Sequence, residues 1–375
     1  MSEFDAIRPY YDDEVRDVLA RIVASRDLAQ AASPLVMPNW LANSSVGHRL
    51  TRRVFRYKTR NLKTIRDCQN MLADLIETVI HRTMDRLSGS GLGRLSPNQH
   101  YLFISNHRDI LMDSSLLNYL LHDAGHDTCR MAVGDNLLHN TLAADLMRLN
   151  KSFVVERSAA GIRAQYRALA RTSRYMQYSL QQGISVWIAQ RQGRAKDGFD
   201  RTDPALLKML LLAYRDKSAD QTPLQRLLAL TPVVPVSVSY ELDPCAKSKA
   251  HELAVIEQCG EYIKKPDEDL QSMVQGLMGY KGRVRIAFGE PITAANSLED
   301  LTEQLDQAIV ANTRLYPTHR YARALSEGLD TQDLVNYPTV RVLAKELASL
   351  SVAERPFLLQ QYANIWRNRQ DLGID

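Results

Sequence analysis

The stretch Tyr101-Leu-Phe-Ile-Ser-Asn-His-Arg-Asp-Ile-Leu-Met-Asp113 contains the strongest functional signal in the chain. A short apolar run ends in the polar residues 105–107, and acidic side chains follow at Asp109 and Asp113, where a helical pattern begins. The pattern predicts that His107 lies at the carboxyl end of a buried strand, with a carboxylate about one helical turn away. An imidazole held by a carboxylate can act as a general base near neutral pH.

The composition indicates a folded protein. The chain has 375 residues, of which 45% are hydrophobic and 24% are charged, and this fits one large or two ordinary domains rather than a disordered chain. The net charge of +4 is too small to indicate nucleic acid as a partner. It does allow an anionic substrate or an anionic membrane surface.

Other features bear on the cellular location. The four cysteines are scattered without metal-ligand spacing, which favours a reducing compartment. The segment 1–5 lacks an apolar signal core, and no apolar run reaches the ~18–20 residues that span a bilayer. We therefore expect a cytoplasmic protein, with peripheral attachment to the cytoplasmic membrane face as an open alternative.

Hydrophobic periodicity divides the chain into three regions. Residues 1–90 and 294–375 show apolar side chains at helical spacing. In residues 91–293 short apolar runs alternate with helical patterns, which predicts an α/β domain with a mostly parallel central sheet flanked by helices. The expected strands are 101–105, 129–133, 152–156, 184–189, 233–239 and 283–288, and the expected helices between them are 110–122, 141–149, 160–182 and 204–216.

Two more strands carry features of interest. Arg157 follows the predicted strand 152–156, where a guanidinium could bind phosphate and where an ordinary surface arginine is the alternative. Residues 231–240 form a strong β run that contains Pro235. A proline in such a run predicts a strand start, a bulge or an edge, although a simple core strand is the plainer interpretation.

The loop after strand 184–189 is basic. It holds Arg191, Arg194 and Lys196, and Gly193 relaxes the backbone between them. Cations and glycines at a strand end favour an anion-binding loop, with a solvated basic loop as the alternative.

Taken together and in this order, these elements resemble the phospholipid and glycerol acyltransferase family. That family carries a block Asn-His-x-x-x-x-Asp, an apolar block ending in Arg, a block like Phe-Pro-Glu-Gly-Thr-Arg-Ser, and an apolar block around a Pro. The matching stretches are Asn106-His107, Phe153 to Arg157, Gln192-Gly193-Arg194 and Val234-Pro235-Val236. The resemblance covers about residues 90–293.

The resemblance implies an O-acyltransferase of phospholipid biosynthesis. An acyl group would pass from acyl-CoA or an acyl carrier protein to a hydroxyl of glycerol 3-phosphate, a lysophospholipid or a related acceptor, without a metal or bound cofactor. His107 would deprotonate the hydroxyl. The residues expected to contact the substrates are Asn106, Arg157, Gln192, Gly193, Arg194 and Lys196.

The sequence departs from the family pattern at two places. The family aspartate lies five residues after the histidine, and here Met112 occupies that position. Asp113 lies one residue later and Asp109 three residues earlier, and we slightly favour Asp113 as the residue that orients His107. In the third block Gln192 replaces the usual glutamate.

Two other functions remain open on the sequence. A non-catalytic lipid-binding or scaffold protein on the same fold would fit the shifted aspartate and Gln192. A hydrolase with Ser105 or Ser114 as nucleophile is less favoured, because neither serine lies in a Gly-x-Ser-x-Gly elbow.

Overall fold

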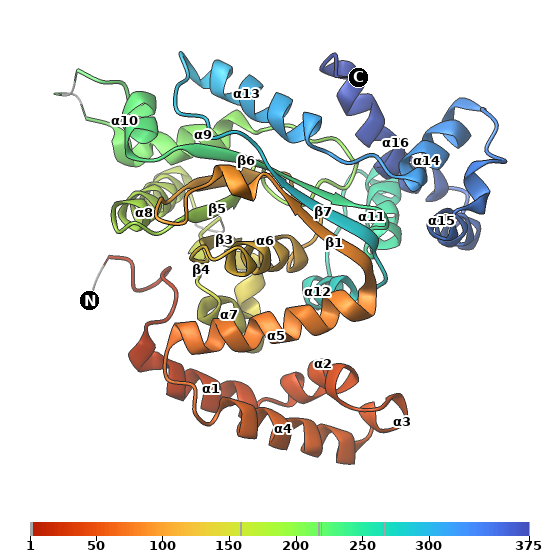
Figure 1. Cartoon of the computed structure of the whole chain (residues 1–375), viewed down its shortest axis with the longest axis horizontal. Helices are drawn as coiled ribbons and strands as arrows, with labels where there is room; N and C mark the ends of the chain where they lie inside the picture. The colour runs from red at the N-terminus through yellow and green to blue at the C-terminus, as the bar shows by residue number, and fades with distance from the viewer. Residues whose placement is uncertain (1–2, 158–159, 217, 219, 266, 375) are drawn as a thin grey trace. The chain divides into compact units, whose positions relative to one another are not determined.

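The computed structural model describes residues 3–157, 160–216, 218, 220–265 and 267–374. The chain divides into two compact units, the first comprising Met1–Leu75 and Arg130–Tyr175 and the second comprising Ile76–Cys129 and Met176–Asp375. Two long helices, α5 (Ile65–Thr83) and α8 (Ile162–Gln181), contribute residues to both units. Figure 1 shows the elements coloured in chain order.

The first unit is rich in helices from the amino-terminal region. After a 3-10 turn, η1 (Asp12–Glu14), come α1 (Val15–Ala24), α2 (Arg26–Val36), α3 (Asn39–Ala42) and α4 (Ser45–Thr59). Apolar residues spaced for one helix face bring Val15 and Leu19 of α1 into a buried cluster with Phe55 of α4. The later segment adds the parallel strands β3 (Arg130–Gly134) and β4 (Ser152–Val155), with η3 (Asp135–His139) and α7 (Thr141–Leu149) between them.

A sheet organises the second unit. Its strands are β1 (Met84–Ser90), β2 (Leu102–Ser105), β5 (Val186–Ala189), β6 (Val233–Tyr240) and β7 (Gly282–Phe288), and they lie in the order β1-β7-β6-β2-β5. All neighbours run parallel except β6 and β7. β2 and β6 are buried along their whole length, as expected for strands covered on both faces. The predicted α/β fold with a mostly parallel sheet flanked by helices is confirmed.

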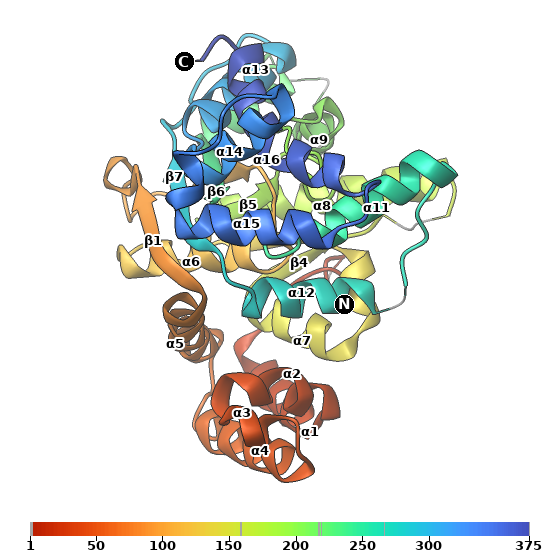
Figure 2. The ribbon, with the colours of Figure 1, turned by 90° about the vertical axis from the view of Figure 1, so that its right-hand side faces the viewer.

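Helices cover this sheet and extend the unit. They are α6 (Met112–Asp123), α9 (Pro204–Leu210), α10 (Pro223–Leu230), α11 (Ala246–Cys259), α12 (Glu268–Met278), α13 (Leu298–Ala311), α14 (Pro317–Glu327), α15 (Pro338–Ser349) and α16 (Arg355–Asp371), with short 3-10 turns η2 (Leu92–Arg94), η4 (Leu211–Tyr214) and η5 (Leu334–Asn336). α14, α15 and α16 pack together, and α16 also packs on α11 (Figures 1 and 2). α9 begins as predicted, with Asp203 capping the Ala205 N–H at 2.8 Å and Pro204 in the first position.

The predicted strands are present where they were expected, but the structure contains further elements that were not predicted. Each of the expected strands is present within about two residues of its predicted ends. β1 was not predicted, because its sequence Met-Asp-Arg-Leu-Ser-Gly-Ser shows no apolar alternation and it pairs only with β7 within its unit. Helices α10 to α12 were also missed. The domain boundaries expected at residues 90 and 293 stay predictions.

Pro235 lies within β6, where pairing with β7 is irregular. Val236 pairs with Phe288, whereas Val233 bridges to Ile292. The two contacts are three residues apart on β6 but four residues apart on the segment that follows β7, so this segment has one extra residue. The Pro235 carbonyl still accepts the Gly289 N–H at 2.8 Å. The missing N–H of proline thus falls at a bulge, one of the alternatives that the sequence left open.

Within the described ranges, no helix combines the length and the hydropathy needed to cross a bilayer.

Candidate active site

The candidate site starts where β2 ends. Asn106 is fully buried, and its side-chain oxygen accepts the Val238 N–H at 2.7 Å while its amide nitrogen donates to the Val238 carbonyl at 3.1 Å. The side chain therefore continues the pairing of β2 with β6 beyond the last residue of the strand. The same nitrogen also donates to Asp200 at 3.0 Å. This geometry supports a positioning role for Asn106, and its contact with a substrate stays a prediction.

His107 comes next and is held by one acid. Its Nδ1 lies 2.8 Å from Oδ2 of Asp113, and the ring packs edge-on against Trp187 of β5. The side chain is 15% exposed, and among the described residues Nε2 makes no hydrogen bond. A carboxylate at Nδ1 favours the tautomer with the proton on Nδ1, which leaves the Nε2 lone pair available to accept a proton.

The Asp113 carboxylate is saturated with donors. Oδ2 also accepts the backbone N–H groups of Arg108 at 2.6 Å and Asp109 at 3.0 Å, and Oδ1 accepts the Tyr240 hydroxyl at 2.9 Å. Complete burial alone would raise the pKa of Asp113, but the hydrogen bonds from His107 and the backbone outweigh it and lower the pKa below the usual range. Asp113 is therefore ionised at neutral pH.

Asp109 does not contact His107 but binds the backbone at the start of α6. Its Oδ1 accepts the backbone N–H groups of Leu111 at 3.0 Å and Met112 at 2.8 Å, so it caps the start of α6. Burial and the nearby charge of Asp113 raise the pKa of Asp109. The structure thus places Asp113, not Asp109, at the imidazole, one residue beyond the spacing usual in the family.

The loop after β5 runs beside the His107 loop. Ser105 pairs with Ala189, so β2 and β5 end level with each other. The Gln190 N–H then donates to the Ser105 carbonyl at 2.7 Å, and the Ala195 N–H donates to the His107 carbonyl at 2.8 Å. Between them Gly193 has φ +75°, a conformation that glycine adopts without strain. The residues that flank the third sequence block are therefore hydrogen-bonded to the end of β2 and to the histidine loop.

The cations of this loop differ in availability. Arg191 pairs with Asp197 at 2.9 Å, and Lys196 pairs with Glu252 of α11. Arg194 forms no ion pair with any described residue, and its Nη1 is buried without a hydrogen-bond partner. Gln192 is exposed. Of these three cations, Arg194 is thus the one without a carboxylate partner among the described residues, while substrate contacts of Gln192, Gly193, Arg194 and Lys196 stay predictions.

Arg157 belongs to the first unit and follows β4. Its backbone N–H donates to Asp135 at 3.0 Å. Its guanidinium lies close to Gly134 at the end of β3. Burial lowers the pKa of Arg157, with the Asp135 charge opposing the shift. Contact of Arg157 with the substrate of His107 stays a prediction.

Sequence reasoning missed the side chains that hold the histidine loop. Arg108 is buried and donates to Asp200 at 2.6 Å, and its carbonyl accepts the buried Lys249 ammonium at 2.6 Å. Lys249 also pairs with Asp243. No motif spacing marks these residues. Tyr240 alone carried a signal, because it ends the β run around Pro235.

The hydroxyl groups of the two serines considered as nucleophiles are hydrogen-bonded within the fold. Ser105 Oγ donates to the Asn106 carbonyl at 2.7 Å and accepts the Trp187 indole N–H at 2.9 Å. Ser114 Oγ donates to the Leu111 carbonyl at 3.3 Å. Both hydroxyls are used within the fold, which argues against the hydrolase alternative.

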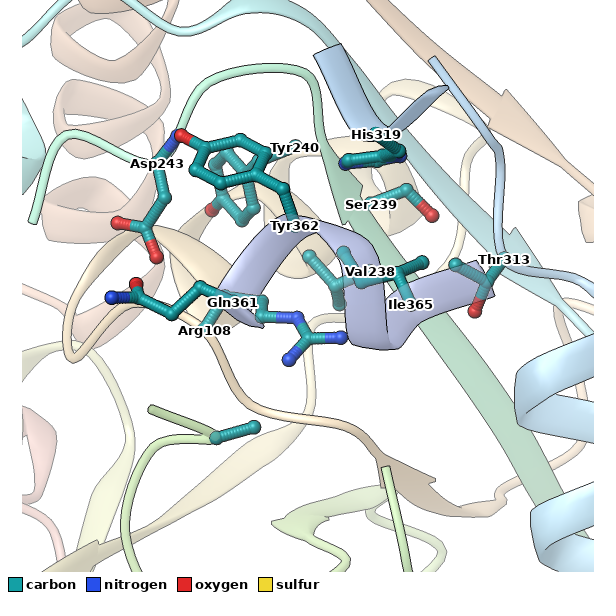
Figure 3. A pocket seen from close by; sticks show the side chains of 11 residues that line it. Arg108, Val238, Ser239, Tyr240, Asp243, Thr313, His319, Gln361, Tyr362 and Ile365 are labelled. Atoms are coloured by element: carbon teal, nitrogen blue, oxygen red, sulfur yellow. The ribbon is translucent and has the colours of Figure 1, made fainter. Parts of the chain in front are cut away.

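A small cavity lies next to Arg108, with β6 and α16 contributing to its walls (Figure 3). Its volume of about 20 Å³ suits one water molecule, not a substrate. Burial, followed by the charge of Arg108, lowers the pKa of His319 in its wall to about 3, so that imidazole is neutral. The lining residues are Arg108, Ala195, Val238, Ser239, Tyr240, Asp243, Thr313, His319, Gln361, Tyr362 and Ile365.

Comparisons with known proteins bear on this arrangement. The structure is similar to the crystal structure of the 1-acyl-sn-glycerophosphate (LPA) acyltransferase PlsC from Thermotoga maritima, with 13% sequence identity, a TM-score of 0.39, and coverage of 70% of this chain and 79% of that chain. No curated protein matches the sequence. Residues 86–199 match the family model described as Acyltransferase. That match includes β2, β5 and the loops that carry His107 and Arg194, and it supports the resemblance of this segment to the acyltransferase family.

Proposed function

We propose that the protein transfers a fatty acyl group from an acyl thioester to a hydroxyl of glycerol 3-phosphate, a lysophospholipid or a related acceptor in phospholipid biosynthesis. The observation that carries this proposal is the 2.8 Å contact between His107 Nδ1 and the buried Asp113 carboxylate at the end of β2. The family match over residues 86–199 supports the class of reaction. The donor would be acyl-CoA or an acyl carrier protein.

The chemistry follows from the free Nε2 of His107. This nitrogen takes the proton of the acceptor hydroxyl as the oxygen attacks the thioester carbonyl. The tetrahedral intermediate then expels the thiolate, which takes the proton back from the imidazolium. Ionised Asp113 stabilises the imidazolium and keeps the ring in the reactive tautomer. Each step balances without a metal or a bound cofactor.

The acceptor phosphate would bind at Arg194. The guanidinium follows β5 in the loop that is hydrogen-bonded to His107, and its buried Nη1 has a donor to spare. An anion at this donor would satisfy a polar group whose burial is otherwise costly. On the sequence, Arg157 is also a candidate phosphate ligand. Holding the phosphate would fix the distance between the acceptor hydroxyl and the base.

The test is acyl transfer by the His107→Ala variant. We expect turnover to fall by at least about 100-fold, because the general base is lost. His122→Ala, an exposed histidine on α6, is the matched control and should keep full activity. The assay follows thiol release from acyl-CoA with a panel of hydroxyl acceptors and identifies products by mass.

The outcomes separate the proposal from its alternative. Full activity of His107→Ala, with an unchanged melting curve, would show that another group is the base. A wild-type protein that binds lipid tightly but turns over no acceptor, with either donor, would favour the non-catalytic lipid-binding function.

A further inference from the structure

The positive charge of the chain is concentrated in one segment of the first unit. Residues 28–66 contain no Asp or Glu and eight basic residues: Arg49, Arg52, Arg53, Arg56, Lys58, Arg60, Lys63 and Arg66. The whole chain has a net charge of only +4, so the rest of it carries a net −4. Segregation on this scale indicates an anionic partner for this segment.

Most of these cations lie on α4, and one face of that helix anchors it. Gly47, Thr51, Phe55 and Thr59 recur every four residues and are buried. This face packs on α1 and α2 within the first unit, and Phe55 belongs to the unit's apolar cluster. The buried face of α4 therefore holds this helix against α1 and α2, and none of the eight basic residues belongs to that face.

The outer face of α4 is also apolar in part. Val46, Leu50 and Tyr57 are 56%, 40% and 64% exposed, and at about 100° per residue they fall within a narrow sector opposite Phe55. Exposed arginines flank this sector at positions 49, 53, 56 and 60, and the Arg60 guanidinium stacks on the Tyr57 ring at 4.1 Å. The fold does not need exposed apolar side chains here.

Trp40 on the neighbouring helix α3 is a further exposed apolar side chain. Its side chain is 82% exposed, an unusual state for the largest apolar residue. α3 lies very close to α4 at Gly47, where any larger side chain would collide with the Leu41 carbonyl oxygen: an added Cβ would lie only 2.0 Å from it. Ser44 Oγ also donates to that oxygen at 2.7 Å. The tryptophan is thus held beside α4 by a tightly packed corner, and Figure 2 shows the two helices together.

We propose that the α3–α4 surface, made of Trp40, Val46, Leu50, Tyr57, Arg49, Arg53, Arg56 and Arg60, docks on an anionic lipid bilayer. Arginines would meet lipid phosphates while tryptophan and tyrosine sit at headgroup depth and the aliphatic side chains enter the acyl boundary. Nucleic acid would engage the arginines but offers nothing for exposed valine and leucine. The proposal does not depend on the proposed reaction.

Vesicle binding by the full-length protein tests the charge. We expect binding to phosphatidylglycerol vesicles, at least tenfold weaker binding to phosphatidylcholine vesicles, and loss of binding as salt rises. The double variant Arg49→Glu/Arg53→Glu should bind at least tenfold more weakly. Arg320→Glu/Lys345→Glu changes the net charge equally at exposed positions of the second unit and should bind like wild type.

The apolar part of the surface has its own readout. The indole emission of Trp40 should shift to shorter wavelength when vesicles are added, and Trp40→Ala should abolish the shift and weaken binding several-fold. Trp187 is buried and Trp366 lies on α16 in the second unit, so neither should contribute a shift. Ile263→Ala is the matched control, because Ile263 is 81% exposed in the second unit.

Each outcome decides for or against the α3–α4 surface. Melting curves establish that the variants are folded. Equal binding to both vesicle types, or binding that neither α4 variant nor Trp40→Ala alters, would overturn the proposal. Tight binding to duplex DNA with none to phosphatidylglycerol vesicles, lost in Arg49→Glu/Arg53→Glu, would assign the surface to nucleic acid. Failure of the acyl-transfer assay would leave the vesicle result standing.

Discussion

Replacing Asp113 with asparagine probes the centre of the candidate site. The carboxylate accepts four donors: His107 Nδ1, the backbone N–H groups of Arg108 and Asp109, and the Tyr240 hydroxyl. Asparagine has nearly the same shape, so the packing of α6 is preserved. It is uncharged, however, and its NH₂ group only donates. The NH₂ group takes the place of one carboxylate oxygen, so either the Tyr240 hydroxyl at Oδ1 or the three donors at Oδ2 lose their acceptor.

The size of the effect follows from these contacts. A hydrogen bond to a charged group contributes about 1.5–3 kcal/mol, and losing that much transition-state stabilisation slows a reaction roughly 10- to 150-fold. An amide NH₂ facing His107 would also favour the proton on Nε2, which would remove the lone pair that acts as base. We therefore expect kcat to fall by at least about 100-fold, with KM for the acyl donor changed by less than about threefold.

The assay is steady-state thiol release from acyl-CoA, with urea unfolding to establish stability. Asp109→Asn is the matched control, because it makes the same chemical change in the carboxylate that caps α6 and does not contact the ring. Its kcat should stay within about threefold of wild type, since asparagine also caps helices. If Asp113→Asn keeps more than half the activity while Asp109→Asn loses it, Asp109 orients the base and the reasoning is wrong.

Three further predictions concern the same site. Arg194→Ala should raise KM for a phosphorylated acceptor at least about tenfold, whereas Lys196→Ala, whose ammonium is already paired, should change it less than about threefold; equal effects would reject Arg194 as the distinct phosphate ligand. Tyr240→Phe removes the donor to Asp113 Oδ1 and should lower the free energy of unfolding by about 1–3 kcal/mol in urea titrations; an unchanged midpoint would show that this bond is not stabilising. Because the pKa of Asp113 is lowered in the folded state, its ionised form stabilises the fold above the ordinary aspartate pKa of about 3.9, and this contribution is lost as pH falls through the lowered value. The stability difference between wild type and Asp113→Asn should therefore shrink below about pH 4, and a difference that grows there would contradict the shift.

The positions of the loops that form the candidate site were predictable, because each loop follows a strand that the sequence identifies. Apolar runs with short lengths identified β2, β5 and β6, and parallel strands bring their carboxyl ends to one edge. The pairing of β2 with β5 therefore places the segments of His107 and Arg194 beside each other. The choice between Asp113 and Asp109 was harder, because it depends on where α6 begins. The helix was expected from residue 110, but it starts at Met112.

Side-chain partners across the fold were not predictable in the same way. Lys196 pairs with Glu252 on α11, a helix that the sequence pattern did not reveal. Asp200 follows the third block without any spacing signal, and only the folded loop brings it to Arg108. Such pairs join residues about 50 or more positions apart, and a single sequence shows no periodicity at that range.

The two contacts of Asp200 have a consequence for how the site responds to ligands. One carboxylate oxygen binds Asn106 and Arg108, the neighbours of His107 on either side, so the peptide segment that carries the imidazole is clamped at both flanks. We infer that this segment is preorganised and undergoes little rearrangement when a ligand arrives. The amide hydrogens of Arg108 and Asp109, which are bonded to the buried Asp113 carboxylate, should then exchange slowly with deuterium even in the free protein.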